Sequence, residues 1–156
     1  MTILERLFTL QDIKYKEFND KLIPNISSNT TIGIKIPNLR KLSKELLKEN
    51  GYNDFISKND HLYFEEKLLH GFLLEKIDDF DEAIKRVELF LPMIDNWAIS
   101  DTVKINAFKK HKDLLINYIY KWLESDHIYT QRFAIVQLMR YYLDEDFKCE
   151  YLEKVS

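Results

Sequence analysis

The stretch PNLRKLSKELLKENG, residues 37–51, shows which kind of fold this chain adopts. Proline is favoured at the first position of a helix, and Asn-Gly is typical of a helix end. Between them, leucines recur at the spacing of one helix face, at Leu39, Leu42, Leu46 and Leu47. The stretch therefore predicts a helix that begins at Pro37 and ends near Asn50.

The same helical periodicity runs through nearly all of the chain. Only three Gly and three Pro interrupt it, and the clearest loop is SSNTT at residues 27–31. A short β-like alternation appears only at residues 31–36. The periodicity predicts further helices at about 2–10, 13–22, 52–57, 61–76, 79–91, 95–109, 111–124, 127–143 and 146–155. The sequence thus predicts an all-α fold.

These helices fall into pairs. Pair starts near 61, 95 and 127 recur roughly every 33 residues, which is the scale of helical solenoid repeats. An α-solenoid would stack the pairs and leave an extended curved surface. Periodicity alone fits an ordinary helical bundle equally well.

Gly71 lies inside the apolar run KLLHGFLL. Glycine inside a helix costs about 1 kcal/mol relative to alanine. We therefore expect another helix to pack closely against this position.

The composition indicates one folded domain over residues 1–156, with 46% apolar residues. A single cysteine, Cys149, fits a reducing compartment. The N-terminus does not resemble a signal peptide, and no apolar run approaches the length that spans a membrane. These features predict a cytoplasmic protein without a membrane partner.

Charge is segregated along the chain, although the net charge is only −3. Residues 31–50 carry five bases against two acids, and residues 101–112 carry four against one. Residues 51–100 carry five bases against eleven acids. The basic stretches are either solvated helix faces or contacts for an anionic partner.

The segment IDNWAISD, residues 94–101, is the strongest candidate for a site. Its Trp97 and Asp101 are four residues apart, a spacing that places both on one face of a helix. An aromatic plate beside a carboxylate suits a cation, or a transition state that becomes cationic. The alternative is a core tryptophan beside a surface acid.

Arg132 lies on the apolar stripe of the segment YTQRFAIVQLMRYYL, residues 129–143. A guanidinium there either extends to solvent or faces a polar cleft that holds an anion. The sequence indicates neither a phosphate-binding loop nor a zinc site. The three glycines do not cluster in a glycine-rich loop, and the four histidines lack the spacing of zinc ligands. No metal and no cofactor is therefore expected.

Five segments together resemble the DNA alkylation repair glycosylases, the AlkD-like proteins built of HEAT-like repeats. They follow in the family's order: EFNDKLIP (17–24), GIKIPNLRKL (33–42), YFEEKLLHGFLL (63–74), DNWAISD (95–101) and QRFAIVQL (131–138). The resemblance implies a right-handed α-solenoid of antiparallel helix pairs. Since the family normally continues for about two further pairs, it also implies that this chain is truncated at its C-terminus.

The resemblance implies an activity and a site. Trp97 and Asp101 match the family's catalytic Trp-x-x-x-Asp, and Arg132 matches its catalytic arginine. The implied function is a monofunctional, monomeric DNA glycosylase that acts on double-stranded DNA. It would excise cationic alkylated purines, such as 3-methyladenine and 7-methylguanine, without metal or cofactor. Weaker candidates for contacts with the DNA backbone are Lys35, Arg40, Lys104, Lys109 and Lys110.

The chemistry of these residues agrees with that role. An N-alkylated purine is already a good leaving group, so the sugar, which becomes oxocarbenium-like, is what needs stabilising. A carboxylate such as Asp101 supplies that stabilisation. The alternative function is a catalytically inactive HEAT-like scaffold that binds DNA or protein through its concave face.

Overall fold

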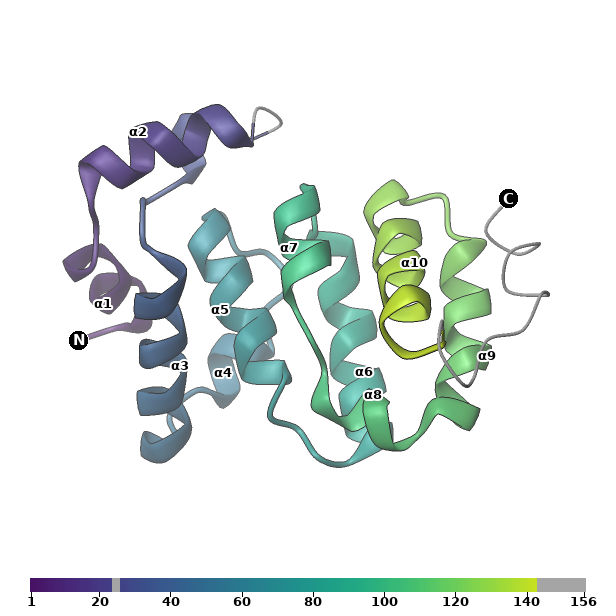
Figure 1. Ribbon diagram of the computed structural model, residues 1–156. Coiled ribbons are helices and arrows are strands. Elements are labelled where there is room, and N and C mark those ends of the chain that lie inside the picture. The colour runs from purple at the N-terminus through teal and green to yellow at the C-terminus, as the bar shows by residue number, and fades with distance from the viewer. Residues whose placement is uncertain (24–25, 143–156) are drawn as a thin grey trace.

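The computed structural model describes residues 1–23 and 26–142, and every regular element in these ranges is helical (Figure 1). The all-α fold class is thereby confirmed. The helix expected at 146–155 lies outside the described residues. The α-helices are α1 (Ile3–Thr9), α2 (Ile13–Leu22), α3 (Ile36–Glu49), α4 (Asn53–Ile56), α5 (Phe64–Leu74), α6 (Phe80–Phe90), α7 (Trp97–Thr102), α8 (Asn106–Lys110), α9 (Lys112–Leu123) and α10 (Ile128–Tyr142). Two short 3₁₀ turns, η1 (Ser28–Thr30) and η2 (Leu91–Met93), complete the set.

Helix α3 forms much as its sequence predicts. Pro37 lies in its first turn, where a missing N–H costs nothing. Asn50 ends the helix in the left-handed conformation, with φ of 58°, and its N–H bonds to the Leu46 carbonyl. The leucine stripe packs inward, with Leu39, Leu42 and Leu46 buried.

The helices lie side by side in nearly the order in which they follow in sequence. Helix α3 contacts α5, α5 contacts α7, and α7 contacts α10, so these four form one row (Figure 1). Helices α4 and α6 pack on α5, α8 packs on α6 and α9, and α9 packs on α10. Within the described ranges no helix is long and apolar enough to cross a membrane.

Helix α5 is the buried centre of the array, and Gly71 lies in its middle. A Cβ placed on Gly71 would collide with the side chain of Val103, which follows α7, and would crowd Phe90. The expected close packing at this glycine is confirmed. The closest neighbour is the extended residue Val103 just beyond α7, and Phe90, the last residue of α6, makes the other close contact.

The prediction of one continuous helix over 95–109 is wrong. Helix α7 ends at Thr102, residues 103–105 are extended, and α8 begins at Asn106. Val103 and Ile105 are fully buried, while Lys104 between them is exposed. Burying two β-branched side chains in the core outweighs the helical periodicity, because β-branched residues lose little in an extended backbone.

Of residues 31–36, where the sequence shows a β-like alternation, residues 31–35 form an extended segment that pairs with no strand in the described residues, and Ile36 already begins α3. The carboxylate of Glu65, on α5, accepts hydrogen bonds from the backbone N–H groups of Ile32 (2.8 Å) and Gly33 (2.9 Å). Gly33 has φ of 91° and lies against the backbone of Asp12 and Lys16, so only glycine fits there. This segment ties α2 to the rest of the fold.

Candidate functional site

The ion pair between Asp101 and Arg132 forms the centre of the candidate site. Asp101 is on α7 and Arg132 is on α10, the two helices that pack side by side. Arg132 donates from Nε to Oδ1 at 2.8 Å and from Nη2 to Oδ2 at 2.7 Å. The side chain of Asp101 is 30% exposed and that of Arg132 is 49% exposed. This fork geometry fixes the plane of the carboxylate while leaving the pair open to solvent.

The hydrogen bonds from Arg132 to Asp101 raise the pKa of the guanidinium above its ordinary value. Arg132 is therefore a permanent cation beside the carboxylate. Ser100 adds a third contact, because its hydroxyl donates to Oδ1 of Asp101 at 3.2 Å.

Trp97 is 42% exposed, unlike Trp122, which is buried in the core. It lies one turn before Asp101 on the same helix. The interpretation of Trp97 as a core tryptophan is therefore wrong, because its indole lines a surface groove that Arg132 also lines.

That groove has a volume of about 560 Å³ and runs along one face of α10, beside Trp97 of α7. Its wall is mainly apolar, and Arg132 is the one ionisable cation among the described residues that line it. The remaining lining residues are Ile128, Tyr129, Gln131, Ile135, Val136 and Met139. The groove thus combines an aromatic plate, an apolar wall and an ion pair at its edge.

The first turn of α7 is held in place by its cap. Asn96 is fully buried, and its side-chain oxygen accepts from the N–H of Ile99 at 3.2 Å. Its amide donates to Asp95, which also binds Lys67 of α5 at 2.9 Å. Asn96 directly before a helix is a recognisable capping signal, although the helix was expected to begin at residue 95, two residues before Trp97.

The five basic residues expected to contact DNA do not lie together. Arg40 binds Glu75 at 3.0 Å, and its guanidinium lies over the ring of Phe72 at 4.0 Å. Lys35 is 3.8 Å from Asp12. Lys104 is exposed in the segment that follows α7. Lys109 and Lys110 are exposed at the end of α8, which packs on α6 and α9 rather than on α7.

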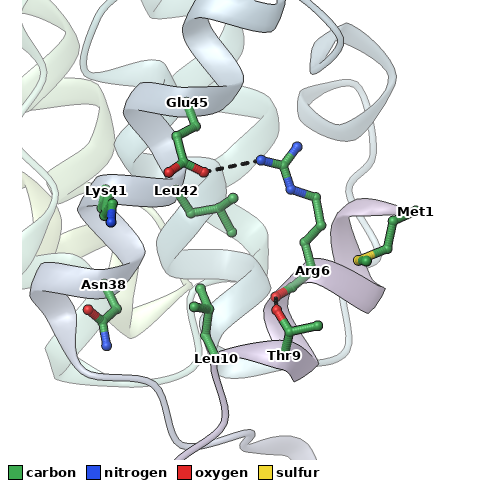
Figure 2. A pocket seen from close by; sticks show the side chains of 8 residues that line it. All are labelled: Met1, Arg6, Thr9, Leu10, Asn38, Lys41, Leu42 and Glu45. Carbon is green, nitrogen blue, oxygen red and sulfur yellow. Dashed lines mark hydrogen bonds and ion pairs between the residues drawn. The ribbon is translucent and has the colours of Figure 1, made fainter.

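A second hollow, of about 340 Å³, lies between α1 and α3 (Figure 2). Arg6 crosses it to Glu45 at 3.2 Å, and Glu49 accepts from the same guanidinium at 2.8 Å. Leu10 and Leu42 form its floor in this view. None of the described residues that line this hollow is aromatic, so among them there is no counterpart of Trp97.

Among the described residues no cluster of three or more His, Cys, Asp or Glu side chains could hold a metal ion. The only close histidines, His61 and His70, are buried and bond to each other at 3.1 Å. Burial lowers the pKa of His70 to about 3.

Sequence reasoning missed two polar residues near the site, Arg140 and Glu75. Arg140 donates to the main-chain carbonyl of Asp101 at 2.9 Å, and Glu75 accepts from the N–H of Lys104 at 3.0 Å. Both contacts exist only because the helix breaks after Thr102, and no sequence pattern signalled that break.

The comparison with protein families matches a range of the chain that includes all three residues of the candidate site. A family model described as DNA alkylation repair enzyme matches residues 3–151, which include Trp97, Asp101 and Arg132. No curated protein and no solved structure matches the chain. A match over nearly the full length shows that the chain belongs to the family of DNA alkylation repair enzymes.

Proposed function

We propose that this protein is a monofunctional DNA glycosylase that removes cationic alkylated purines from double-stranded DNA. The observation that carries the proposal is an open groove that is lined by the exposed Trp97 and by Arg132, whose guanidinium holds the carboxylate of Asp101. Family membership supports a role in the repair of alkylated DNA. The glycosylase chemistry, the lesions and the residue roles are inferred from the groove.

The proposed reaction needs little acid catalysis. Alkylation at N3 or N7 gives the purine a positive charge, so the base leaves as a neutral molecule when the glycosidic bond breaks. The positive charge then moves to the sugar, which becomes oxocarbenium-like. The carboxylate of Asp101 stabilises that charge and positions the attacking water.

Trp97 is the proposed platform for the cationic nucleotide. Its exposed ring face lies in the groove and is free to pack on the sugar or the alkylated base. A cation over an indole gains about 0.5–2 kcal/mol, depending on how far water is excluded. The apolar wall of α10 would exclude part of that water.

Arg132 has two proposed tasks. Its Nε and Nη2 orient Asp101, while its Nη1 has no hydrogen-bond partner in the described part of the chain. Nη1 is therefore available for a phosphate beside the lesion, and such a contact would set the register of the DNA.

The helical array suits a duplex partner. The sequential contacts from α3 to α10 support a right-handed α-solenoid of HEAT-like pairs, which would present the groove on an extended surface. Lys104 lies two residues beyond the end of α7 and is the proposed backbone contact nearest to Asp101. Lys35, Arg40, Lys109 and Lys110 are proposed as more distant contacts.

The test is release of 3-methyladenine or 7-methylguanine from methylated duplex DNA by the purified chain. Asp101→Asn should abolish release, since the amide cannot stabilise the oxocarbenium charge. The fold should survive, because exposed ion pairs contribute only about 0–1 kcal/mol. Asp113→Asn, which changes an exposed aspartate on α9, is the matched control and should keep wild-type activity.

Two results would contradict the proposal. If Asp101→Asn releases base as fast as wild type, Asp101 is not catalytic. If wild type releases no base and binds no duplex, the scaffold function is the better description.

A further inference from the structure

The segment between α7 and α8 is held in an extended conformation by residues from two other helices. Residues 103–105 leave the helix, so their polar groups need outside partners. The N–H of Lys104 donates to Oε2 of Glu75 at 3.0 Å, and the N–H of Asn106 donates to the Glu75 carbonyl at 3.1 Å. Glu75, at the end of α5, thus binds the downstream side of the break.

Arg140 binds the upstream side. Its Nη2 donates to the carbonyl of Asp101 at 2.9 Å, and its Nη1 donates to the carbonyl of Val103 at 3.0 Å. The last carbonyls of a helix have no partner within the helix, so Arg140 supplies the missing donors. The guanidinium is partly buried and directed at the backbone rather than at DNA.

Two arginines of α10 therefore bind the same residue of α7. Arg132 binds the carboxylate of Asp101, and Arg140, eight residues later on α10, binds its main-chain oxygen. Helix α7 has only six residues, and an isolated helix of that length is unstable in water. The direction of the Asp101 side chain must therefore be set by contacts from outside α7.

We propose that Arg140 is a positioning residue, which holds the main chain of Asp101 so that its carboxylate meets Arg132 at the groove. The inference rests on the proposed function of that groove. Loss of Arg140 would leave two partly buried carbonyls without these donors and allow the end of α7 to shift. A displacement of about 1 Å at a catalytic group lowers the rate roughly 100-fold.

The kinetic test compares single-turnover excision of 7-methylguanine from duplex DNA by wild type, Arg140→Met and Arg140→Lys. Arg140→Met should lower the rate constant roughly 10- to 100-fold while changing the Kd for duplex DNA less than about threefold. Arg140→Lys should recover part of the rate, since one donor remains. Arg86→Met, which removes an α6 arginine bound to Glu82, should match wild type.

A second readout does not depend on activity. In ¹H–¹⁵N spectra the Nε–H of Arg132 is protected from exchange by its bond to Asp101, and Arg132→Lys identifies the resonance by removing it. In Arg140→Met the resonance should move and exchange at least tenfold faster with water. Thermal unfolding of each variant establishes that it is folded at the temperature of both measurements.

The outcomes separate the two proposals. If the Arg132 resonance is unchanged in Arg140→Met, or if that variant excises as fast as wild type, Arg140 does not position Asp101. If wild type has no glycosylase activity but the resonance responds as expected, the positioning role stands and the proposed function fails.

Discussion

At the scale of single residues, the carboxylates of Glu65, Glu75 and Asp101 lie in different surroundings, and these surroundings give them different tasks. Glu65 is fully buried against two backbone N–H groups, and burial raises its pKa despite those bonds. Glu75 is buried as well and holds Arg40 and the N–H of Lys104. Asp101 alone of these three combines an arginine partner with a partly exposed side chain. The first two therefore stabilise the fold, while Asp101 remains accessible to a ligand.

His70 gives a prediction for stability against pH. Burial, together with the charges of His61 and Arg86, lowers the pKa of His70 to about 3, against an ordinary value near 6.5. Between these values the unfolded chain binds a proton that the folded chain refuses, so stability falls as the pH falls below 6.5. Urea unfolding should show a loss of about 2 kcal/mol from pH 7 to pH 5.

His70→Phe should remove most of that loss, because phenylalanine fills the same space and does not titrate. His111→Gln, which changes the histidine beside Phe80, should keep it. An unchanged slope in His70→Phe would assign the pH dependence to other groups.

At the scale of elements, the break after α7 decides where the site residues lie. A continuous helix over 95–109 would leave Glu75 without the N–H of Lys104 and would carry Val103 away from Gly71. Gly71 in α5 makes room for Val103, so the glycine and the break depend on each other. The end of α7, and with it Asp101, is thus placed by a small residue in a neighbouring helix.

Gly71→Ala tests that dependence. Alanine would gain about 1 kcal/mol of helix propensity, but its Cβ would collide with the stiff side chain of Val103. We expect a net loss of about 1–3 kcal/mol in the free energy of unfolding, measured with urea. Gly51→Ala is the matched control, because nothing lies within 4 Å of its added Cβ, and it should change stability little. Equal stability of Gly71→Ala and wild type would mean that the side chain of Val103 moves away from the added Cβ at little cost in free energy.

At the scale of the whole molecule, contacts between successive helices fix the positions of α7 and α10, the helices that line the groove. The row α3, α5, α7 and α10 brings Arg40, Glu75 and Asp101 into one connected set of contacts across distant parts of the chain (Figure 1). The acidic stretch 51–100 contains α4, α5, α6 and the start of α7, while Lys104 lies two residues beyond the end of α7. DNA binding by such a chain must rest on a few well-placed cations rather than on a generally basic surface.

The salt dependence of duplex binding tests this arrangement. If Lys104 contacts a phosphate, Lys104→Gln should reduce the slope of log Kobs against log salt concentration by about 0.9. Lys85→Gln, on α6, is the control and should leave the slope unchanged. Equal slopes for wild type and Lys104→Gln would mean that Lys104 does not contact a phosphate of the DNA. Titrations by fluorescence anisotropy at several salt concentrations provide the measurement.

The sequence by itself determined the helices and the identity of the candidate residues. Helical periodicity and end signals such as Asn50-Gly51 act locally, so α3, α5, α6, α9 and α10 appear near their predicted positions. The spacing of Trp97 and Asp101 is also local, because one turn of a helix places both on one face. Arg132 stood out in the sequence as a cation on an apolar helical stripe, and the family resemblance, confirmed over residues 3–151, joined it to Trp97 and Asp101.

Only the tertiary structure decided how those residues meet. The break at residues 103–105 depends on burial of Val103 and Ile105 against other helices, and on Glu75 and Arg140 from distant parts of the chain. Likewise, the exposure of Trp97 and the pairing of Asp101 with Arg132 depend on how α7 packs on α10. Such long-range packing competes with local helix propensity and here outweighs it, so no local pattern could reveal it.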